Sequence, residues 1–303
     1  MTHKSVLIDE VAAFFRGIDG VFVDATLGLG GHSERILTEN PHVKVIGIDK
    51  DIISLDFTKN KLARFGKRFS ALQGGFAETI KTILQSHKNI GGILADLGIS
   101  SPQVDNLERG FSLKSPRLDM RMDIDSTLDA NFVINHYPKD ELSRVFRDFG
   151  EIRGSDKIAN LIVESRKKRH IKSGEDLCKI AESHTKTKAG IHPATLIFQA
   201  IRIEVNNELG EVRDFLSNIS QLSGAKIAII SFHSLEDRIV KRAFKEWSAS
   251  CICDDSVMKC ECGGNHKRGE ILTKKPIIPS SDEIAQNKRA RSAKMRCFRF
   301  YEK

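Results

Sequence analysis

The stretch that decides the fold is Gly20-Val-Phe-Val-Asp-Ala-Thr-Leu-Gly-Leu-Gly-Gly-His32. Its apolar run ends in an acid, Asp24, and a glycine-rich turn then leads into the amphipathic run Ser33–Leu37. The order strand, glycine turn, helix is typical of the first unit of a nucleotide-binding α/β sheet. Glycines such as Gly30 and Gly31 have no Cβ, so the backbone can approach a cofactor closely. The carboxylate of Asp24 suits a cationic or hydroxyl-bearing cofactor better than a pyrophosphate, which favours S-adenosylmethionine (AdoMet).

The same alternation of apolar strands and helical segments continues through the first hundred residues. Further strands are predicted at Val43–Asp49, Phe69–Gly74 and Gly92–Leu97, with helices between them. Such alternation is typical of a parallel sheet, and ligands of open parallel sheets bind outside the carboxyl ends of the strands. Asp49, Phe76 and Asp96 all fall at or just beyond such strand ends.

Each of these three residues has a predicted role in binding AdoMet. Asp49 would accept hydrogen bonds from both ribose hydroxyls, and Phe76 would lie against the adenine face. Asp96 would accept a hydrogen bond from the base amino group or contact the methionine ammonium. The alternative is a nicotinamide cofactor, because an acid about twenty residues beyond a glycine turn also serves that ribose. The turn lacks the third glycine of that fingerprint, so AdoMet is favoured.

The alternation stops between about residues 105 and 205, where the pattern is helical. Helices are predicted at Asp140–Phe149, Ser155–Arg169, Gly174–Lys186 and Pro193–Asn207. The α/β pattern then resumes with helices at Glu208–Leu222 and Glu236–Trp247, and strands at Ala225–Phe232, Ile271–Ile278 and Lys294–Tyr301. The prediction is a Rossmann-like α/β core of about seven strands with a final antiparallel pair. The core would comprise residues 1–104 and 207–303, and an all-helical substrate-recognition domain, residues 105–206, would be inserted in it.

The charge of the chain indicates a polyanionic partner. The chain has 303 residues, a net charge of +8 and a pI near 9.1. Basic residues cluster at Arg166–His170 and in residues 286–303, where seven Lys/Arg stand against one acid. Such clusters favour a nucleic-acid substrate, although a solvated helix face is the alternative for each.

No apolar run is long enough to span a membrane, and acids near the N-terminus argue against export, so a cytoplasmic location is expected.

Four of the six cysteines form the pattern Cys251-x-Cys253-x6-Cys260-x-Cys262. Two closely spaced thiolate pairs are candidate ligands of a structural zinc ion. The spacing is tighter than the usual C-x2-C, so a cysteine-rich loop in a reducing compartment is the alternative.

The segment Asp96-Leu-Gly-Ile-Ser-Ser-Pro-Gln103 follows the fourth strand. Methyltransferases that act on exocyclic amines commonly carry a short polar-Pro-Pro-aromatic loop at this place. Ser-Ser-Pro-Gln is related in position but lacks the second proline and the aromatic residue. Backbone carbonyls around Ser100, Ser101 and Pro102 would accept hydrogen bonds from a cytosine amine and align it for methyl transfer.

His233 would contact the cytidine or take up the released proton, or it would simply cap the next helix. Arg202, with Gln199, would line the cleft or form a surface salt bridge.

Several long motifs of the chain match a known family. They are Asp-Ala-Thr-Leu-Gly-Leu-Gly-Gly-His (24–32), Asp-Leu-Gly-Ile-Ser-Ser-Pro-Gln (96–103), Glu-Arg-Gly-Phe-Ser (108–112), Leu-Asp-Met-Arg-Met-Asp (118–123), His-Pro-Ala-Thr (192–195), Phe-Gln-Ala-Ile-Arg-Ile (198–203), Ser-Phe-His-Ser-Leu-Glu-Asp-Arg-Ile-Val-Lys (231–241) and Ala-Arg-Ser-Ala-Lys-Met-Arg (290–296). Over nearly its whole length the chain resembles the bacterial small-subunit ribosomal RNA cytosine-N4-methyltransferases of the RsmH, or MraW, family.

This resemblance implies a class I AdoMet-dependent methyltransferase that modifies N4 of one cytidine in the decoding centre of 16S rRNA. It also implies an inserted helical domain. Its cofactor site falls on Gly30, Gly31, His32, Asp49, Phe76, Asp96 and Gln103. The substrate would be 16S rRNA, within the small subunit or an assembly intermediate. An RNA-binding assembly factor without turnover is the alternative from another class, and the retained acids at the strand ends argue against it.

Overall fold

The computed structural model describes residues 5–182, 192, 194–254 and 259–302, and divides the chain into two compact units. The first unit comprises residues 1–98 and 210–303, and the second comprises residues 99–209. Each unit has a hydrophobic core of its own and is described separately below.

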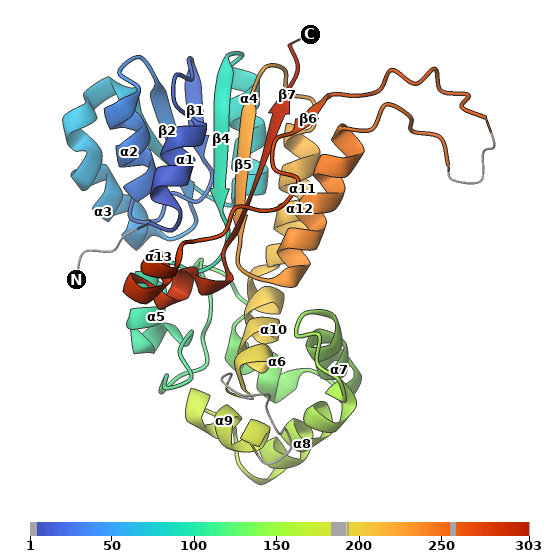
Figure 1. Cartoon of the computed structure of the whole chain (residues 1–303). Coiled ribbons are helices and arrows are strands. Elements are labelled where there is room, and N and C mark those ends of the chain that lie inside the picture. Colours follow the sequence, from blue (N-terminus) through green and yellow to red (C-terminus); the bar gives the residue numbers. More distant parts are fainter. Residues whose placement is uncertain (1–4, 183–191, 193, 255–258, 303) are drawn as a thin grey trace. The chain divides into compact units, whose positions relative to one another are not determined.

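The first unit is built on a seven-stranded sheet with the strand order β3-β2-β1-β4-β5-β7-β6 (Figure 1). The strands are β1 (Val21–Asp24), β2 (Lys44–Asp49), β3 (Phe69–Gln73), β4 (Ile90–Asp96), β5 (Lys226–Ser231), β6 (Gly269–Ile271) and β7 (Lys294–Phe300). The first five strands are parallel, and β7 runs antiparallel between β5 and β6. All five parallel strands therefore end at the same edge of the sheet.

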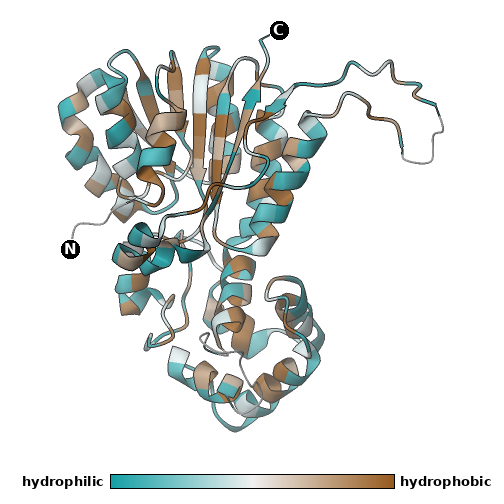
Figure 2. Ribbon diagram, viewed as in Figure 1, coloured by the Kyte–Doolittle hydropathy of each residue, from teal (hydrophilic) through white to brown (hydrophobic). Residues whose placement is uncertain are grey.

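Helices cover both faces of this sheet because alternate strand residues are apolar on both sides (Figure 2). In β1, Val21 and Val23 pack on one face and Phe22 on the other. The first face is covered by α4 (Phe76–Ser86), α11 (Glu208–Ile219) and α12 (Ser234–Trp247). The second is covered by α1 (Ile8–Phe14), α2 (Gly31–Glu39) and the short segment around η3 (Lys288–Ser292). The chain also forms α3 (Ile52–Leu62), η1 (Ala63–Arg68) and α13 (Ser281–Gln286).

The second unit contains helices only among its described residues. They are α5 (Ser101–Asp105), η2 (Leu107–Arg109), α6 (Ala130–His136), α7 (Lys139–Asp148), α8 (Ser155–Lys168), α9 (Gly174–Glu182) and α10 (Ala194–Asn206). Their apolar faces form one core that includes Phe146, Ile162 and Ile201. The end of the predicted helix Gly174–Lys186 and the start of Pro193–Asn207 lie outside the described residues.

The prediction of a strand over Ile271–Ile278 was wrong. The strand β6 covers Gly269–Ile271, and further along only Ile277 forms an isolated bridge, to Met295. The β-branched residues of this segment were misleading because Lys274, Lys275 and Pro276 interrupt them, and proline lacks the N–H that a ladder needs. The short helices α1, α5, α6 and α13 were also missed. Among the described residues, no helix combines the length and the apolar character that crossing a membrane requires.

Candidate active site

Three carboxylates lie at the edge where the parallel strands end. Asp24 closes β1, and it pairs in register with Gly47 of β2 and Leu94 of β4. Asp49 on β2 and Asp96 on β4 therefore lie two residues further toward the carboxyl ends of their strands than the partners of Asp24. This edge is the one where open α/β sheets bind their ligands.

The turn between β1 and α2 contains three glycines, and the space around the missing side chain differs among them. A Cβ on Gly30, which has a φ of +69°, would lie 2.5 Å from Thr58 Cγ2, and one on Gly31 would overlap Ser5 Oγ. Both glycines therefore pack closely against the protein itself, Gly30 against the buried Thr58 and Gly31 against the hydroxyl of Ser5. Gly28 differs, because its φ is +49° and the nearest atom to an added Cβ is 4.0 Å away. Gly28 is thus the glycine of this turn whose missing side chain faces open space.

Asp49 connects the end of β2 to the glycine turn. Its Oδ2 accepts a hydrogen bond from Gly28 N at 2.7 Å, and its Oδ1 accepts one from Asp51 N at 2.9 Å. Burial raises the pKa of Asp49 to about 6, although these two N–H groups act in the opposite direction. A carboxylate held in this way is positioned without using all of its acceptor capacity, since each oxygen has a second lone pair.

Asp24 is almost completely buried, and its described partners belong to the protein. Ser33 Oγ donates to its Oδ2 at 2.7 Å, and Thr26 N lies 3.4 Å from its Oδ1. Burial raises the pKa of Asp24, while the nearby His32 works in the opposite direction. This geometry gives Asp24 a supporting position beneath the turn, since it ties the end of β1 to the first turn of α2.

His32 and Asp96 carry the least satisfied polar groups of this edge. His32 is 5% exposed, and its Nε2 lies 3.6 Å from Asp96 Oδ2, beyond normal hydrogen-bond distance. Both ring nitrogens of His32 and Oδ1 of Asp96 are buried without a hydrogen-bond partner among the described residues. Asp96 is held through its backbone, because its N–H donates to Thr26 Oγ1 at 2.7 Å. Buried polar groups are normally paired, so these atoms are oriented for a partner that a ligand would supply.

Phe76 starts α4 just beyond β3, as predicted, and its ring packs edge-on against Phe215 with centroids 5.2 Å apart. Its neighbour Gly75 leaves room for Glu211, whose carboxylate would overlap a Cβ at that position. Glu211 also forms an ion pair with Lys50, the residue after Asp49. The ends of β2 and β3 are therefore joined to α11 by one charged contact and one aromatic contact.

The predicted amine-binding segment belongs to the second unit. Ser100 precedes α5, and its N–H donates to Gln103 Oε1 at 3.0 Å, while Gln103 is 5% exposed. The Ser100 carbonyl accepts from Val104 N at 3.4 Å and the Pro102 carbonyl from Asn106 N at 3.0 Å. Each of these two carbonyls keeps a second lone pair for another donor. The side chain of Ser101 lies outside the described part of the chain.

His233 occupies the position that the alternative interpretation predicted, the N-cap of α12. Its Nδ1 faces Glu236 N at 3.5 Å, and its Nε2 lies 3.1 Å from Glu236 Oε1. Glu236 in turn accepts from Phe232 N at 2.8 Å. The ring is therefore part of a reciprocal cap at the start of a helix that begins at the site's edge of the sheet.

Three other polar candidates hold the helical unit together. Arg202 forms a two-pronged salt bridge with Glu208 at 2.7 and 2.9 Å, and this pair is mostly buried rather than on the surface. Gln199 donates to the Phe149 carbonyl at 3.0 Å. In the basic cluster at 166–170, Arg166 donates to two backbone carbonyls at the end of α6. The polar groups of these three side chains therefore already bind a carboxylate or backbone carbonyls of the protein.

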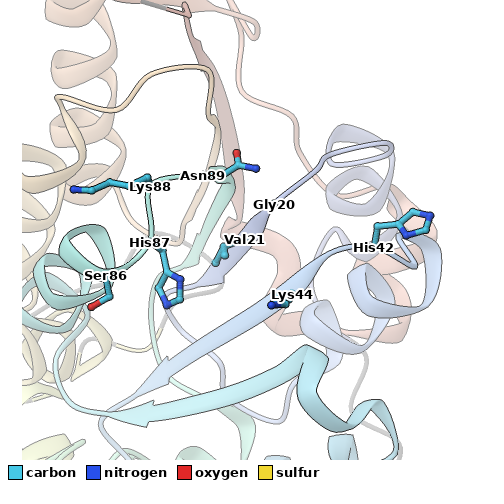
Figure 3. A pocket seen from close by; sticks show the side chains of 8 residues that line it. All are labelled: Gly20, Val21, His42, Lys44, Ser86, His87, Lys88 and Asn89. Carbon is cyan, nitrogen blue, oxygen red and sulfur yellow. The ribbon is translucent and has the colours of Figure 1, made fainter.

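A pocket of about 320 Å³ lies elsewhere in the first unit (Figure 3). Its lining includes Gly20 and Val21 at the start of β1, Lys44 at the start of β2 and Asn89 just before β4. It therefore lies at the amino ends of the parallel strands, opposite to the edge described above. The four clustered cysteines lie apart from both places, in the loop between α12 and β6.

Thr26, Ser33 and Thr58 are site residues that the sequence reading missed. Thr58, on α3, donates through Oγ1 to the Gly28 carbonyl at 2.7 Å, and it is fully buried. Thr26 and Ser33 lie within the opening motif and could have been noticed as polar residues next to Asp24. Thr58 is thirty residues away, and no local pattern marks it.

Comparison with known proteins gives consistent matches over the whole chain. The model of the MraW methylase family matches residues 1–301. A ribosomal RNA small subunit methyltransferase H from Helicobacter pylori is 52% identical over 300 residues, which cover 98% of this chain and 97% of that protein. A protein of the same name from Nitratiruptor is 50% identical over 302 residues, with 99% of each chain covered.

A solved rRNA methylase from Streptococcus thermophilus aligns over the full length of both chains at 10% identity and a TM-score of 0.39. That likeness is too weak to place any ligand or residue in this chain. The first unit has the predicted class I methyltransferase-like fold, a seven-stranded mixed sheet with helices on both faces. Since the family model and relatives at about half identity span essentially the entire sequence, the chain belongs to the MraW methylase family.

Proposed function

We propose that the chain is an AdoMet-dependent methyltransferase of small-subunit ribosomal RNA that modifies N4 of one cytidine in the decoding centre of 16S rRNA. The observation that carries the proposal is the edge of the sheet where His32 and Asp96 have buried polar atoms without partners among the described residues, beside the buried carboxylate of Asp49. Family membership supports methyl transfer, and the names of the relatives support the small-subunit rRNA as substrate.

The residues at this edge fit AdoMet. Asp49 follows the glycine turn and keeps acceptor capacity for ribose hydroxyls, while Phe76 offers an apolar ring for the adenine. Asp96 Oδ1 and the His32 ring lack partners among the described residues, and the cofactor's amino acid end carries an ammonium and a carboxylate that could supply them. Three carboxylates in one place also suit a cofactor with a positive sulfonium. Gln103 is proposed as a further contact on the basis of the resemblance.

When bound, AdoMet supplies a methyl group that is already electrophilic, because it is attached to a positive sulfur. The task of the protein is then mainly alignment. We propose that the second lone pairs of the Ser100 and Pro102 carbonyls accept the N–H groups of the cytosine amine. Such hydrogen bonds return electron density to a nitrogen whose lone pair is delocalised into the ring. Asp96 or His233 is proposed to receive the proton that the amine releases.

A basic segment lies at the same edge of the sheet. Since β7 is antiparallel to β5, Ser231 at the end of β5 pairs with Lys294 at the start of β7. The segment η3, immediately before β7, is therefore near the carboxyl ends of the parallel strands (Figure 1). Its Arg289 and Arg291 side chains are exposed. Cations in this place would contact the phosphates of an RNA whose base enters the site. A cytoplasmic location, where small subunits are assembled, accords with this proposal.

The deciding experiment is methyl transfer followed by nucleoside analysis. The full chain is incubated with methyl-labelled AdoMet and either free 16S rRNA or small subunits from cells that lack the modification. Mass spectrometry of the digested RNA is expected to show N4-methylcytidine. Asp96→Asn should abolish transfer, whereas Asp214→Asn, at an exposed position of α11, should not.

The two RNA substrates also decide whether the enzyme acts on free rRNA or on an assembled particle. A different methylated nucleoside would overturn the cytosine-N4 assignment. AdoMet and RNA binding without any transfer would instead favour the assembly factor.

A further inference from the structure

The loop between α12 and β6 brings together four thiols that are distant from the proposed active site. The sulfur atoms of Cys251, Cys253, Cys260 and Cys262 all lie within 4.8 Å of one another. The Cys251–Cys260 and Cys260–Cys262 sulfur pairs are each 3.6 Å apart, and Cys251–Cys262 is 3.7 Å. A zinc ion with four sulfurs at ~2.3 Å in a tetrahedron places them about 3.8 Å from each other. These three distances match the edges of a zinc tetrathiolate, and the other sulfur pairs lie within 4.8 Å.

The backbone around these sulfurs is arranged as it is around bound thiolates. Ile252 N points to Cys262 Sγ at 3.4 Å, and Glu261 N points to Cys253 Sγ at 3.3 Å. Each C-x-C pair thus directs an N–H group toward a sulfur of the other pair. Such donors offset the negative charge that collects on sulfur when four thiolates share one dication, and they orient the ligands.

The geometry differs from the other ways in which four cysteines can associate. All four are free thiols, and sulfurs 3.6 Å apart are well beyond the ~2.05 Å of a disulfide bond. An iron–sulfur cluster would hold its cysteines further apart, because several iron atoms and sulfides lie between them. One tetrahedral ion fits the space.

Apart from the sulfur contacts, the described residues of the loop are fixed mainly at its base. Hydrogen bonds from Arg268 N to the Trp247 carbonyl, at 2.8 Å, and from His266 N to the Ser250 carbonyl, at 3.0 Å, close its base. Beyond that base, Cys251 and Cys260 are exposed, and Ile252 is 60% exposed, so these described residues of the loop add nothing to a hydrophobic core. Figure 1 shows the described parts of this loop, after α12 and before β6, extending away from the sheet. A crosslink between its two ends would lower the entropy that the loop loses when it holds one conformation.

We propose that Cys251, Cys253, Cys260 and Cys262 bind one structural Zn²⁺ that holds this loop closed. All four positions of the ion would be taken by protein sulfurs, which leaves none for water or substrate, so the site is structural and not catalytic. The ion would join residues up to eleven positions apart in the chain. His266 is not a ligand, because its Nε2 faces the Cys262 carbonyl at 2.8 Å.

The test is the metal content of the full chain, purified from zinc-supplemented cells without chelators and after removal of any affinity tag. Elemental analysis is expected to find about one zinc per chain. Cys260→Ser combined with Cys262→Ser should reduce this to background. Cys178→Ser, in the helical unit and away from the cluster, should leave it unchanged.

Two further measurements separate metal loss from misfolding. The double variant should keep its AdoMet affinity and the unfolding transition of the α/β unit, because the described residues of the loop lie outside both cores of this unit. Protein freed of metal and titrated with Co²⁺ should develop the absorption of a tetrahedral thiolate complex, with an endpoint at one ion per chain. Substoichiometric zinc in the parent, equal zinc in the folded double variant, or iron in place of zinc would each overturn the proposal.

Discussion

Asp49 shows how burial and hydrogen bonding compete at one side chain. Two backbone N–H groups favour its ionised form, yet burial dominates and raises its pKa from 3.8 to about 6. Because the folded-state pKa lies above the unfolded value, the folded state binds more protons between about pH 4 and pH 6. The contribution of Asp49 to stability therefore falls as the pH rises through that window.

The same titration predicts a pH dependence of AdoMet binding. An ionised Asp49 is the better acceptor for ribose hydroxyls, so AdoMet affinity should fall as the pH decreases through about 6. Between pH 7 and pH 5 the loss should approach roughly tenfold, if only the ionised form binds. Isothermal calorimetry across this range measures it. In Asp49→Ala the affinity should be lower by ~1–3 kcal/mol at neutral pH, with this pH dependence removed. Equal parent affinities at pH 5 and pH 7 would contradict the ribose assignment.

Gly31 gives a test of why the turn needs glycine. In Gly31→Ala the new methyl would overlap Ser5 Oγ, so the chain should lose ~1–3 kcal/mol of unfolding free energy. Adding Ser5→Ala should recover part of this loss, because the overlapping oxygen is removed, and a double-mutant cycle would measure the coupling. The AdoMet affinity of the folded double variant should stay close to the parent value. Stability effects that simply add would show that the missing side chain does not face Ser5.

At the scale of elements, the basic C-terminal segment contains two kinds of arginine, a buried one on β7 and exposed ones on η3. Arg296 is mostly buried, and its guanidinium binds Asp237 of α12 at 2.6 and 3.1 Å. Arg289 and Arg291 are exposed on η3. Net charge alone made these residues look equivalent. Packing gives Arg296 a structural role and leaves the other two side chains at the surface.

Replacing the two kinds of cation should have different effects. Arg289→Gln with Arg291→Gln should weaken RNA binding and reduce the slope of log K against log salt by about one unit per lost phosphate contact. The melting temperature and AdoMet affinity should hardly change. Arg296→Gln should instead destabilise the fold by roughly 3–5 kcal/mol, since it leaves Asp237 without its main partner. Salt-dependent RNA titrations and thermal melts distinguish them. An unchanged slope in the first variant would remove η3 from the RNA interface.

The short helix α5 is the element on which the proposed grip on the amine depends. Pro102 fixes the backbone near its start, and proline is favoured in the first turn of a helix. Pro102→Gly should lower turnover by roughly ten- to a hundredfold through lost alignment, with little change in AdoMet affinity. Ser101→Ala should keep much of the activity, because carbonyls and not hydroxyls are proposed to hold the substrate. Single-turnover kinetics compare them. Equal damage from both changes would point to the Ser101 hydroxyl.

At the scale of the molecule, the two units have separate hydrophobic cores. Chains with several cores often depart from two-state unfolding. The proposed cofactor contacts lie mainly in the first unit, which includes Asp49, Phe76 and Asp96. A ligand that binds one unit stabilises the native form of that unit.

Calorimetry should therefore resolve two transitions, of which AdoMet shifts chiefly one. At a free concentration one hundred times Kd, the α/β unit should gain about 2.7 kcal/mol. Hydrogen exchange would assign the protected amides to β1, β2 and β4. An equal shift of both transitions, or protection confined to the helical unit, would contradict this division of roles.

The local sequence determined a large part of this protein. Strand, turn and helix signals lie within ten or so residues of each other, so the order of the elements and the acids at the strand ends could be read directly. The final strand pair was predicted less well, because β6 is short and depends on pairing with β7 rather than on its own propensity. The cysteine spacing marked a candidate metal site, but only the positions of the four sulfurs distinguish a tetrahedron from a loop with scattered thiols.

The tertiary structure decided the partners of each polar group. Thr58 holds the Gly28 carbonyl across thirty residues, and Ser5 fills the space that Gly31 leaves. Arg202 and Arg296 became buried ion pairs, whereas the sequence allowed both to face a substrate. A residue's type states which bonds it can make. Which bond it does make depends on groups that folding brings near it from distant parts of the chain, and no local pattern contains that information.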